Sequence, residues 1–89
     1  MRAIITVLGK DNLGIISKVS HECEKLNVRI IDVSQSLLKD LFAMIMVVDI
    51  SHSTVVLSEL TDTLTSIGHS MGLKIYVMHE DVFNAMHQI

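Results

Sequence analysis

The spacing of apolar residues constrains the fold of this 89-residue chain more than any other feature of its sequence. Residues 2–8 are apolar at almost every position, which is typical of a strand that is buried on both faces. Residues 15–26 instead place Ile15, Val19 and Cys23 four residues apart, which is the apolar stripe of a helix, and Asn27 can end that helix. Residues 28–37 and 41–50 again resemble strands, and only Lys39 and Asp40 separate them, so we expect an antiparallel hairpin.

The second half of the chain predicts another helix and another strand. Ser51, His52 and Ser53 offer polar side chains of the kind that cap a helix, and Gly72 is suited to end it. The stripe of this helix is expected to consist of Val56, Leu60, Leu64, Ile67 and Met71. Residues 73–78 alternate as a fourth strand, and a short last helix is expected from about Glu80.

This order predicts an α+β fold of the ferredoxin-like βαββαβ type. Its four-stranded antiparallel sheet would have the spatial order 2-3-1-4, with two helices on one face and a short C-terminal helix. We expect residues 1–89 to form one domain. Since both main helices lie on one face, the other face would be an apolar surface covered only by the tail, and such a surface usually marks an interface. Exposed edge strands also favour association, so we expect a homodimer formed by sheet packing or by edge-strand packing.

Composition argues against two classes of partner. The formal net charge is −3, the basic residues form no run, and the three aromatic residues are too few for a base-stacking platform, so direct nucleic-acid binding is not expected. The longest apolar run, residues 41–48, is far shorter than the roughly 20 residues of a membrane-spanning helix. The one cysteine, Cys23, excludes an internal disulfide and fits a reducing compartment, so a cytoplasmic location is expected.

The segment from Gly9 to Gly14 is the best local candidate for a ligand site. Gly9 is interpreted as a structural residue of a turn, and Asp11 and Asn12 can cap the helix that follows. The amides at a helix N-terminus suit a carboxylate, and Gly14 lets a ligand approach the backbone closely. A plain strand-to-helix turn explains the same residues, and no nucleotide-binding glycine pattern is present.

Other polar residues give weaker signals. Asp32 and Ser34 should share one face of their strand and Gln35 the other, either as solvated edge residues or as part of a site. The histidines show no metal-ligand spacing, and no cofactor, metal or catalytic set is expected. Cys23 lies on the helical stripe, which favours buried packing over reactivity. The histidines are His21, His52, His69, His79 and His87.

Three segments together resemble the ACT-domain family. They are Gly9-Lys10-Asp11-Asn12-Leu13-Gly14-Ile15, Ile30-Ile31-Asp32-Val33-Ser34-Gln35, and Phe83-Asn84-Ala85-Met86-His87-Gln88-Ile89. The resemblance covers essentially the whole chain and is closest to small stand-alone ACT-domain proteins, which are similar to the glycine cleavage system repressor. It implies a ferredoxin-like dimer that senses an amino acid or another small metabolite in a cleft between subunits.

Carried over residue by residue, the resemblance implies a ligand site at the first turn. Gly14 and the backbone of Asn12, Leu13 and Ile15 would meet the carboxylate of the ligand, and Asp11 could accept from its ammonium group. Arg29 stands where the family often has asparagine. Its guanidinium could bind a carboxylate bidentately, fill the cleft, or pair with Asp11.

The favoured hypothesis is therefore a non-enzymatic, homodimeric regulatory module that binds a small metabolite, with an amino acid as the expected ligand. One alternative is a ligand-free interaction module that binds another regulatory protein or an enzyme, which Arg29 would favour. A remote alternative is an acylphosphatase-like enzyme, but its first loop would need an arginine and this loop has Lys10 and Asn12.

Overall fold

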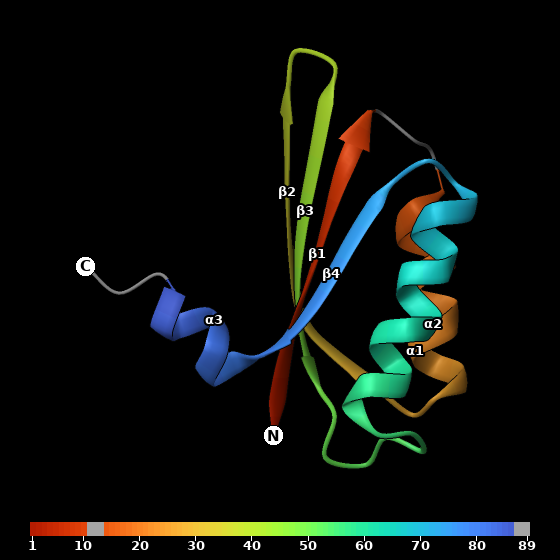
Figure 1. Ribbon diagram of the computed structural model, residues 1–89, viewed down its shortest axis with the longest axis vertical. Helices are drawn as coiled ribbons and strands as arrows, with labels where there is room; N and C mark the ends of the chain where they lie inside the picture. The colour runs from red at the N-terminus through yellow and green to blue at the C-terminus, as the bar shows by residue number, and fades with distance from the viewer. Residues whose placement is uncertain (11–13, 87–89) are drawn as a thin grey trace.

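The computed structural model describes residues 1–10 and 14–86 and has the predicted order of strands and helices (Figure 1). The elements are β1 Arg2–Lys10, α1 Ile15–Lys25, β2 Arg29–Leu38, β3 Leu41–Asp49, α2 Leu57–Ser70, β4 Lys74–His79 and α3 Glu80–Met86. The strands form one antiparallel sheet in the order β2-β3-β1-β4. The predicted ferredoxin-like α+β fold is confirmed.

The helices divide the sheet into two unlike faces. α1 and α2 lie on one side of the sheet, here called the helix-covered face, and α3 lies on the other side, the open face (Figure 1). Alternate residues of β1 and β3 point toward α1 and α2 and pack with the helical stripes into one core. Its fully buried members include Ile5, Val7, Val19, Cys23, Met44, Met46, Val48, Leu60 and Leu64. The predicted burial of Cys23 is confirmed.

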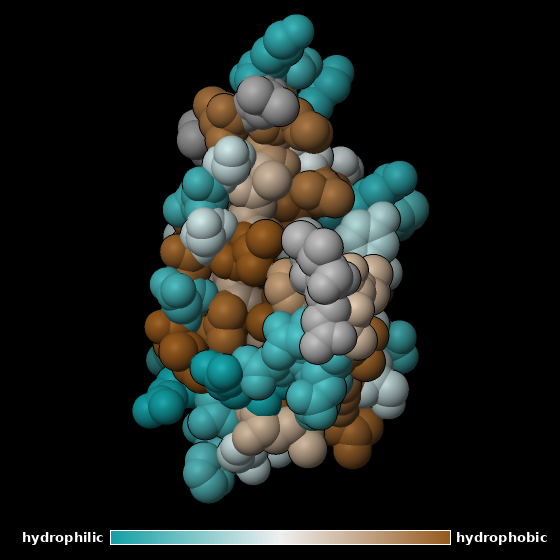
Figure 2. All heavy atoms as spheres, turned by 90° about the vertical axis from the view of Figure 1, so that its left-hand side faces the viewer, coloured by the Kyte–Doolittle hydropathy of each residue, from teal (hydrophilic) through white to brown (hydrophobic). Residues whose placement is uncertain are grey.

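The open face is only partly covered. α3 contacts β1 and β4, and beneath it Ile4 is buried. Leu41 and Ile45 on β3 stay exposed, as does Ile31 on β2. Figure 2 views this side of the molecule and shows hydrophobic side chains gathered on its surface. The expected apolar face without a full cover is therefore present in the chain.

The hairpin of β2 and β3 has the expected geometry. Lys39 adopts a φ of 59°, which suits the tight reversal between the two strands. A register shift falls between Ile30 and Asp32, after which Asp32 lies opposite Val47. Ser34 then lies opposite Ile45, on the open face, and Gln35 opposite Met44, on the helix-covered face. The predicted separation of Asp32 and Ser34 from Gln35 is confirmed.

The start of α2 differs from the prediction. The helix begins at Leu57 rather than after Ser53, and Val56, expected in its stripe, is 68% exposed. The Ser53 hydroxyl accepts from the amide of Val55 and donates to its carbonyl, while the amide of Thr54 donates to Leu26 at the end of α1. These local bonds compete with a helical turn, which is why the serines do not cap α2.

Gly9 also differs from its interpretation as a turn residue. It lies within β1, which continues to Lys10 and pairs with Phe42 and Leu41 of β3. A Cβ atom at Gly9 would overlap the side chain of Leu73. The glycine therefore lets Leu73, just before β4, pack closely against β1, and it does not lie in a reversal of the chain.

Candidate ligand-binding site

The predicted ligand turn runs from Gly9 to Gly14, and Gly14 is its described residue at the start of α1. It occupies the N-cap position of α1 in a left-handed conformation, with φ 92°, and no described side chain caps the helix there. The predicted caps Asp11 and Asn12, together with Leu13, lie outside the described residues. A Cβ atom at Gly14 would meet nothing within 4 Å, so the space beside its backbone is open. As far as the described residues define it, the backbone at Gly14 is accessible, and amides at a helix N-terminus suit an anionic ligand.

Ile15 contributes to this turn through its backbone alone. Its side chain is buried in the core, against the helix-covered face of the sheet. Ile15 thus anchors the first turn of α1, which fixes the direction in which its amides point. Of the predicted site residues, Gly14 and Ile15 are described side by side at one end of the sheet.

Arg29 lies at the opposite end of the sheet from Gly14. Arg29, at the start of β2, pairs with Asp49 of β3. Asp49 also pairs with Arg2, the first residue of β1, whereas the glycine turn follows Lys10, the last residue of β1. The eight steps from Arg2 to Lys10 span about 26 Å at strand geometry. The fold of one chain therefore does not bring Arg29 and the glycine turn together.

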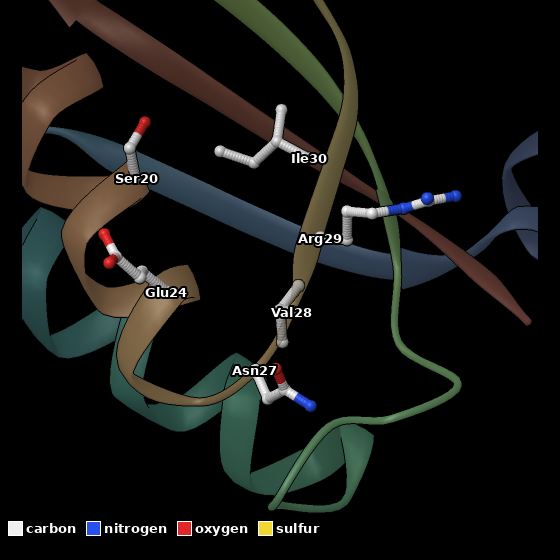
Figure 3. Close-up of a pocket in the computed structure, with 6 residues that line it drawn as sticks. All are labelled: Ser20, Glu24, Asn27, Val28, Arg29 and Ile30. Carbon is white, nitrogen blue, oxygen red and sulfur yellow. The ribbon is translucent and has the colours of Figure 1, made fainter.

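The Arg29 guanidinium has freedom to meet a ligand or a neighbour. Its side chain is 78% exposed, and its one described ion pair joins Nη2 to Asp49 Oδ2 at 3.9 Å. Figure 3 shows the side chain of Arg29 pointing away from α1, while Ile30 points toward it. A charge so loosely held contributes little to folding and stays available for a second group.

A hollow that the sequence did not predict lies beside Arg29, between α1 and β2. It has a volume of about 440 Å³ and is lined by Ser20, Glu24, Asn27, Val28, Arg29 and Ile30 (Figure 3). Val28 and Ile30 provide apolar surface, and the polar side chains surround it. The four-residue spacing of Ser20 and Glu24, which places both on one side of α1, is the sequence signal that could have indicated them.

Asn27 and the loop before α2 shape a second hollow of about 300 Å³. It is lined by Asn27, Arg29, Asp49 and His52. Asn27 adopts a φ of 58° after the end of α1, and its Nδ2 donates to the carbonyl of His52 at 3.0 Å. The Asn27 amide thus ties the end of α1 to the loop before α2.

Asp49 interacts with several charged and polar groups at the end of the sheet where Arg29 lies. Its pKa is lowered from the ordinary value chiefly by hydrogen bonds from Ser51, and further by the N-terminal ammonium of Met1 and by Arg29. The amide of Ser51 donates to Asp49 Oδ1 at 2.9 Å, and the Met1 ammonium donates to Ser51 Oγ at 2.7 Å. Asp49 is thus an ionised anchor that ties β3 to the ends of β1 and β2.

The remaining candidate groups do not assemble into a site within the described residues. No three histidine, cysteine or acidic side chains there are placed to hold a metal ion, and His87 lies outside them. Burial, with a smaller effect of Glu22, raises the pKa of the Cys23 thiol to about 11, so it is a poor nucleophile at neutral pH. Asp32 accepts a hydrogen bond from the amide of Val33 at 2.9 Å and is exposed, as are Ser34 and Gln35.

No helix among the described residues is long and apolar enough to cross a membrane.

Comparison with known proteins gives matches over essentially the full chain. A family model described as an ACT domain matches residues 2–78. The chain is 44% identical over 89 residues to the UPF0237 protein lin0537 of Listeria innocua, with all of both chains covered. It is 36% identical to an ACT domain protein from Streptococcus pneumoniae, with 98% of each chain covered and a TM-score of 0.81.

A more distant structural match extends the fold to larger proteins. A proposed glycine cleavage system transcriptional repressor has a TM-score of 0.74 and 23% identity, covering 99% of this chain and 49% of its own. At this identity the match shows a shared fold only.

Proposed function

Because the chain belongs to the ACT-domain family, we propose that it is a regulatory module, rather than an enzyme, that binds a small metabolite of the amino-acid class. It works as a homodimer in the cytoplasm, with ligand clefts at the subunit interface. ACT domains are commonly small-molecule regulatory modules, and the proposal assigns this role to named residues of this chain.

The observation that carries the proposal is the open glycine turn at the start of α1. Gly14 has a left-handed backbone with free space beside it, directly before the first amides of a helix. A carboxylate bound there would accept hydrogen bonds from these amides and interact favourably with the positive end of the helix dipole. Asp11 is the group proposed to accept from the ammonium of the same ligand.

A second copy is needed to complete the site. Gly14 and Arg29 lie at opposite ends of one sheet, and α1 and the edge strand β2 share one side of the molecule. If two copies pair along this side about a two-fold axis, their β2 strands run antiparallel. The Arg29 end of one copy then lies beside the Gly14 end of the other. Arg29 would contact the ligand from the far side of the cleft, and the hollow between α1 and β2 would accommodate an apolar group.

Such a site regulates without catalysis. A ligand bound between two copies stabilises the dimer by mass action, and it changes the affinity of that dimer for any partner that distinguishes the two states. The Arg29 guanidinium is mostly exposed and has only a long ion pair with Asp49, and no described side chain lies where a Cβ of Gly14 would stand, which supports this role.

Isothermal titration calorimetry with each of the twenty amino acids tests the proposal. We expect saturable heat from at least one of them and its loss in the Gly14→Val variant, because the new side chain fills the space beside the turn. Gly72→Val is the matched control, since Gly72 also has a positive φ, of 72°, and open space around it, but ends α2 instead. Flat heats for all twenty amino acids would contradict the amino-acid assignment.

The ligand-free interaction module is kept as a second candidate because Arg29 replaces the amide side chain common at its position in the family. The same variants separate the two functions. An interaction module would keep its association with a partner or with itself in the Gly14→Val variant, whereas a ligand-dependent dimer would lose the response to the ligand.

A further inference from the structure

We infer that a further hollow, between α2 and the edge strand β4, binds a small organic acid that carries no amino group. The hollow has a volume of about 200 Å³ and is lined by Thr65, His69, Leu73, Lys74, Ile75 and Tyr76. It shares no lining residue with the two hollows beside Arg29. The inference goes beyond the proposed function, because the proposed cleft uses the α1 and β2 side of the molecule and this hollow lies at the other edge of the sheet.

The two halves of the chain build a hollow in the same way. α1 leads into β2 and α2 leads into β4, and these two strands are the opposite edges of the sheet (Figure 1). Each helix ends two residues before a residue with positive φ, Asn27 at 58° and Gly72 at 72°. The next amide, of Val28 or Leu73, donates over 2.8 Å to a carbonyl in the last turn of its helix. An approximate two-fold axis through the sheet therefore relates the hollow between α1 and β2 to the hollow between α2 and β4.

Two polar positions carry the same chemistry in both hollows. The first residue of each edge strand is cationic, Arg29 in β2 and Lys74 in β4. A hydroxyl side chain lines each hollow from the helix, Ser20 from α1 and Thr65 from α2, at the same separation along the chain from the cation. Cations and hydroxyls are the donors that an acid group requires. The hollow between α2 and β4 therefore has donors for a carboxylate or a phosphate group.

A third polar position differs in charge between the two hollows. Glu24 of α1 follows Ser20 by one helical turn, whereas His69 stands at the equivalent position of α2, one turn after Thr65. The carboxylate of Glu24 attracts an ammonium group, but an imidazole in the same hollow as Lys74 offers no negative charge. Among the described residues, no acidic side chain lines the hollow between α2 and β4. Its charge thus favours an anion without an amino group, while the hollow between α1 and β2 also suits a zwitterion.

The donors of the hollow between α2 and β4 are not engaged by the described part of the chain. Its polar side chains form no hydrogen bond or ion pair with any described residue, and they are Thr65, His69, Lys74 and Tyr76. By contrast, Arg2 is paired with Glu80. Leu73 and Ile75, which are almost fully buried, provide an apolar wall for the carbon chain of a ligand.

A nuclear magnetic resonance titration of the ¹⁵N-labelled protein at constant ionic strength tests the inference. The probes are propionate, alanine, which is the same acid with an amino group, and inorganic phosphate. We expect saturable shifts of the amide signals of residues 65–69 and 73–76 with propionate or phosphate, and smaller shifts of these signals with alanine. Shifts at these residues that do not saturate with either anion, or that alanine produces as strongly as propionate, would overturn the inference.

Matched charge variants locate the bound acid group. Lys74→Gln should weaken binding of the bound anion about tenfold, because a charge-assisted hydrogen bond is lost, and Lys74→Arg should retain most of the affinity. Lys18→Gln makes the same change at an exposed lysine of α1 and should leave the affinity unchanged. Equal affinities of the Lys74→Gln and Lys18→Gln variants would contradict the assignment.

A charge exchange tests the difference between the two hollows. His69→Glu gives the hollow between α2 and β4 the acidic group that Glu24 supplies in the other hollow. It should abolish the preference for propionate over alanine at residues 73–76. Ser66→Glu adds the same charge at an exposed position of α2 that does not line the hollow, and should keep the preference. A preference that survives in the His69→Glu variant would contradict the proposed selection by charge.

Discussion

The two faces of the sheet carry similar apolar sequence but are completed in different ways. The helix-covered face is closed by the α1 and α2 of the same chain, and its side chains on β1 and β3 are buried. On the open face, α3 covers β1 and β4 and leaves Ile45 and Leu41 of β3 exposed. The difference teaches that an apolar pattern indicates that a face will be buried, but not which molecule buries it.

The largest expected difference between the two faces is in how much the free energy of unfolding falls when an isoleucine is replaced by alanine. Ile5→Ala on the helix-covered face should destabilise the chain by about 3 kcal/mol, because its side chain is fully buried and leaves a cavity. Ile45→Ala on the open face should cost about 1 kcal/mol in dilute protein, because the side chain is already partly solvated. Urea unfolding at several protein concentrations measures both values.

Protein concentration sharpens this comparison. If a second copy covers the open face, the cost of Ile45→Ala rises with protein concentration, while that of Ile5→Ala changes less. If the two substitutions lower the free energy of unfolding equally in dilute protein, Ile45 is as well buried within one chain as Ile5, and the two faces do not differ in cover.

A smaller effect is expected at Gly68, where α2 packs against Leu73 and Ile75. A Cβ atom at Gly68 would lie 2.7 Å from Ile75 Cγ1 and 3.0 Å from the carbonyl oxygen of Leu73. Gly68→Ala should therefore destabilise the chain by about 1–2 kcal/mol, even after the gain in helix propensity. Ser66→Ala, at an exposed position of α2, is the control and should change stability by less than about 0.5 kcal/mol. A stabilised Gly68→Ala variant would mean that the covered face is loosely packed.

The smallest effect is expected at Asp49, where the open face ends. Its pKa is lower in the folded chain than in the unfolded chain, so the folded state binds the proton less readily. The stability that Asp49 contributes is present at neutral pH and is lost as the pH falls below about 3.9 and through the lowered pKa. Asp49→Asn should remove this part of the acid dependence, and Ser51→Ala, which keeps the backbone hydrogen bond, should remove some of it.

Thermal unfolding between pH 2 and pH 7 measures the effect at Asp49. A wild-type protein and an Asp49→Asn variant that differ in stability by the same amount at every pH would contradict the assignment of this carboxylate as an ionised anchor.

Local sequence patterns predicted most of the fold because the elements differ clearly in period. The order of strands and helices, the faces of Asp32 and Gln35, and the burial of Cys23 follow from spacing alone. The start of α2 did not, because a bond from Thr54 to Leu26, distant in sequence, holds the preceding loop. The role of Gly9 was missed for a similar reason, since it depends on contact with Leu73.

The candidate site was less predictable than the fold. The sequence identified Gly14 and Arg29 but not that one chain holds them at opposite ends of its sheet, since this follows from topology and strand length. The hollow between α1 and β2 was also missed, because it is lined by residues of two elements and forms only when β2 is placed beside α1. The interpretation of Gly14 and Arg29 as parts of a shared ligand site stays a prediction.

The most direct test of the account is the mass of the chain in solution, measured by light scattering at micromolar protein with and without each amino acid. The account predicts at least twice the chain mass of 9.9 kDa and a further shift toward the assembled form with the ligand. A mass of 9.9 kDa at tens of micromolar, unchanged by every amino acid, would contradict it.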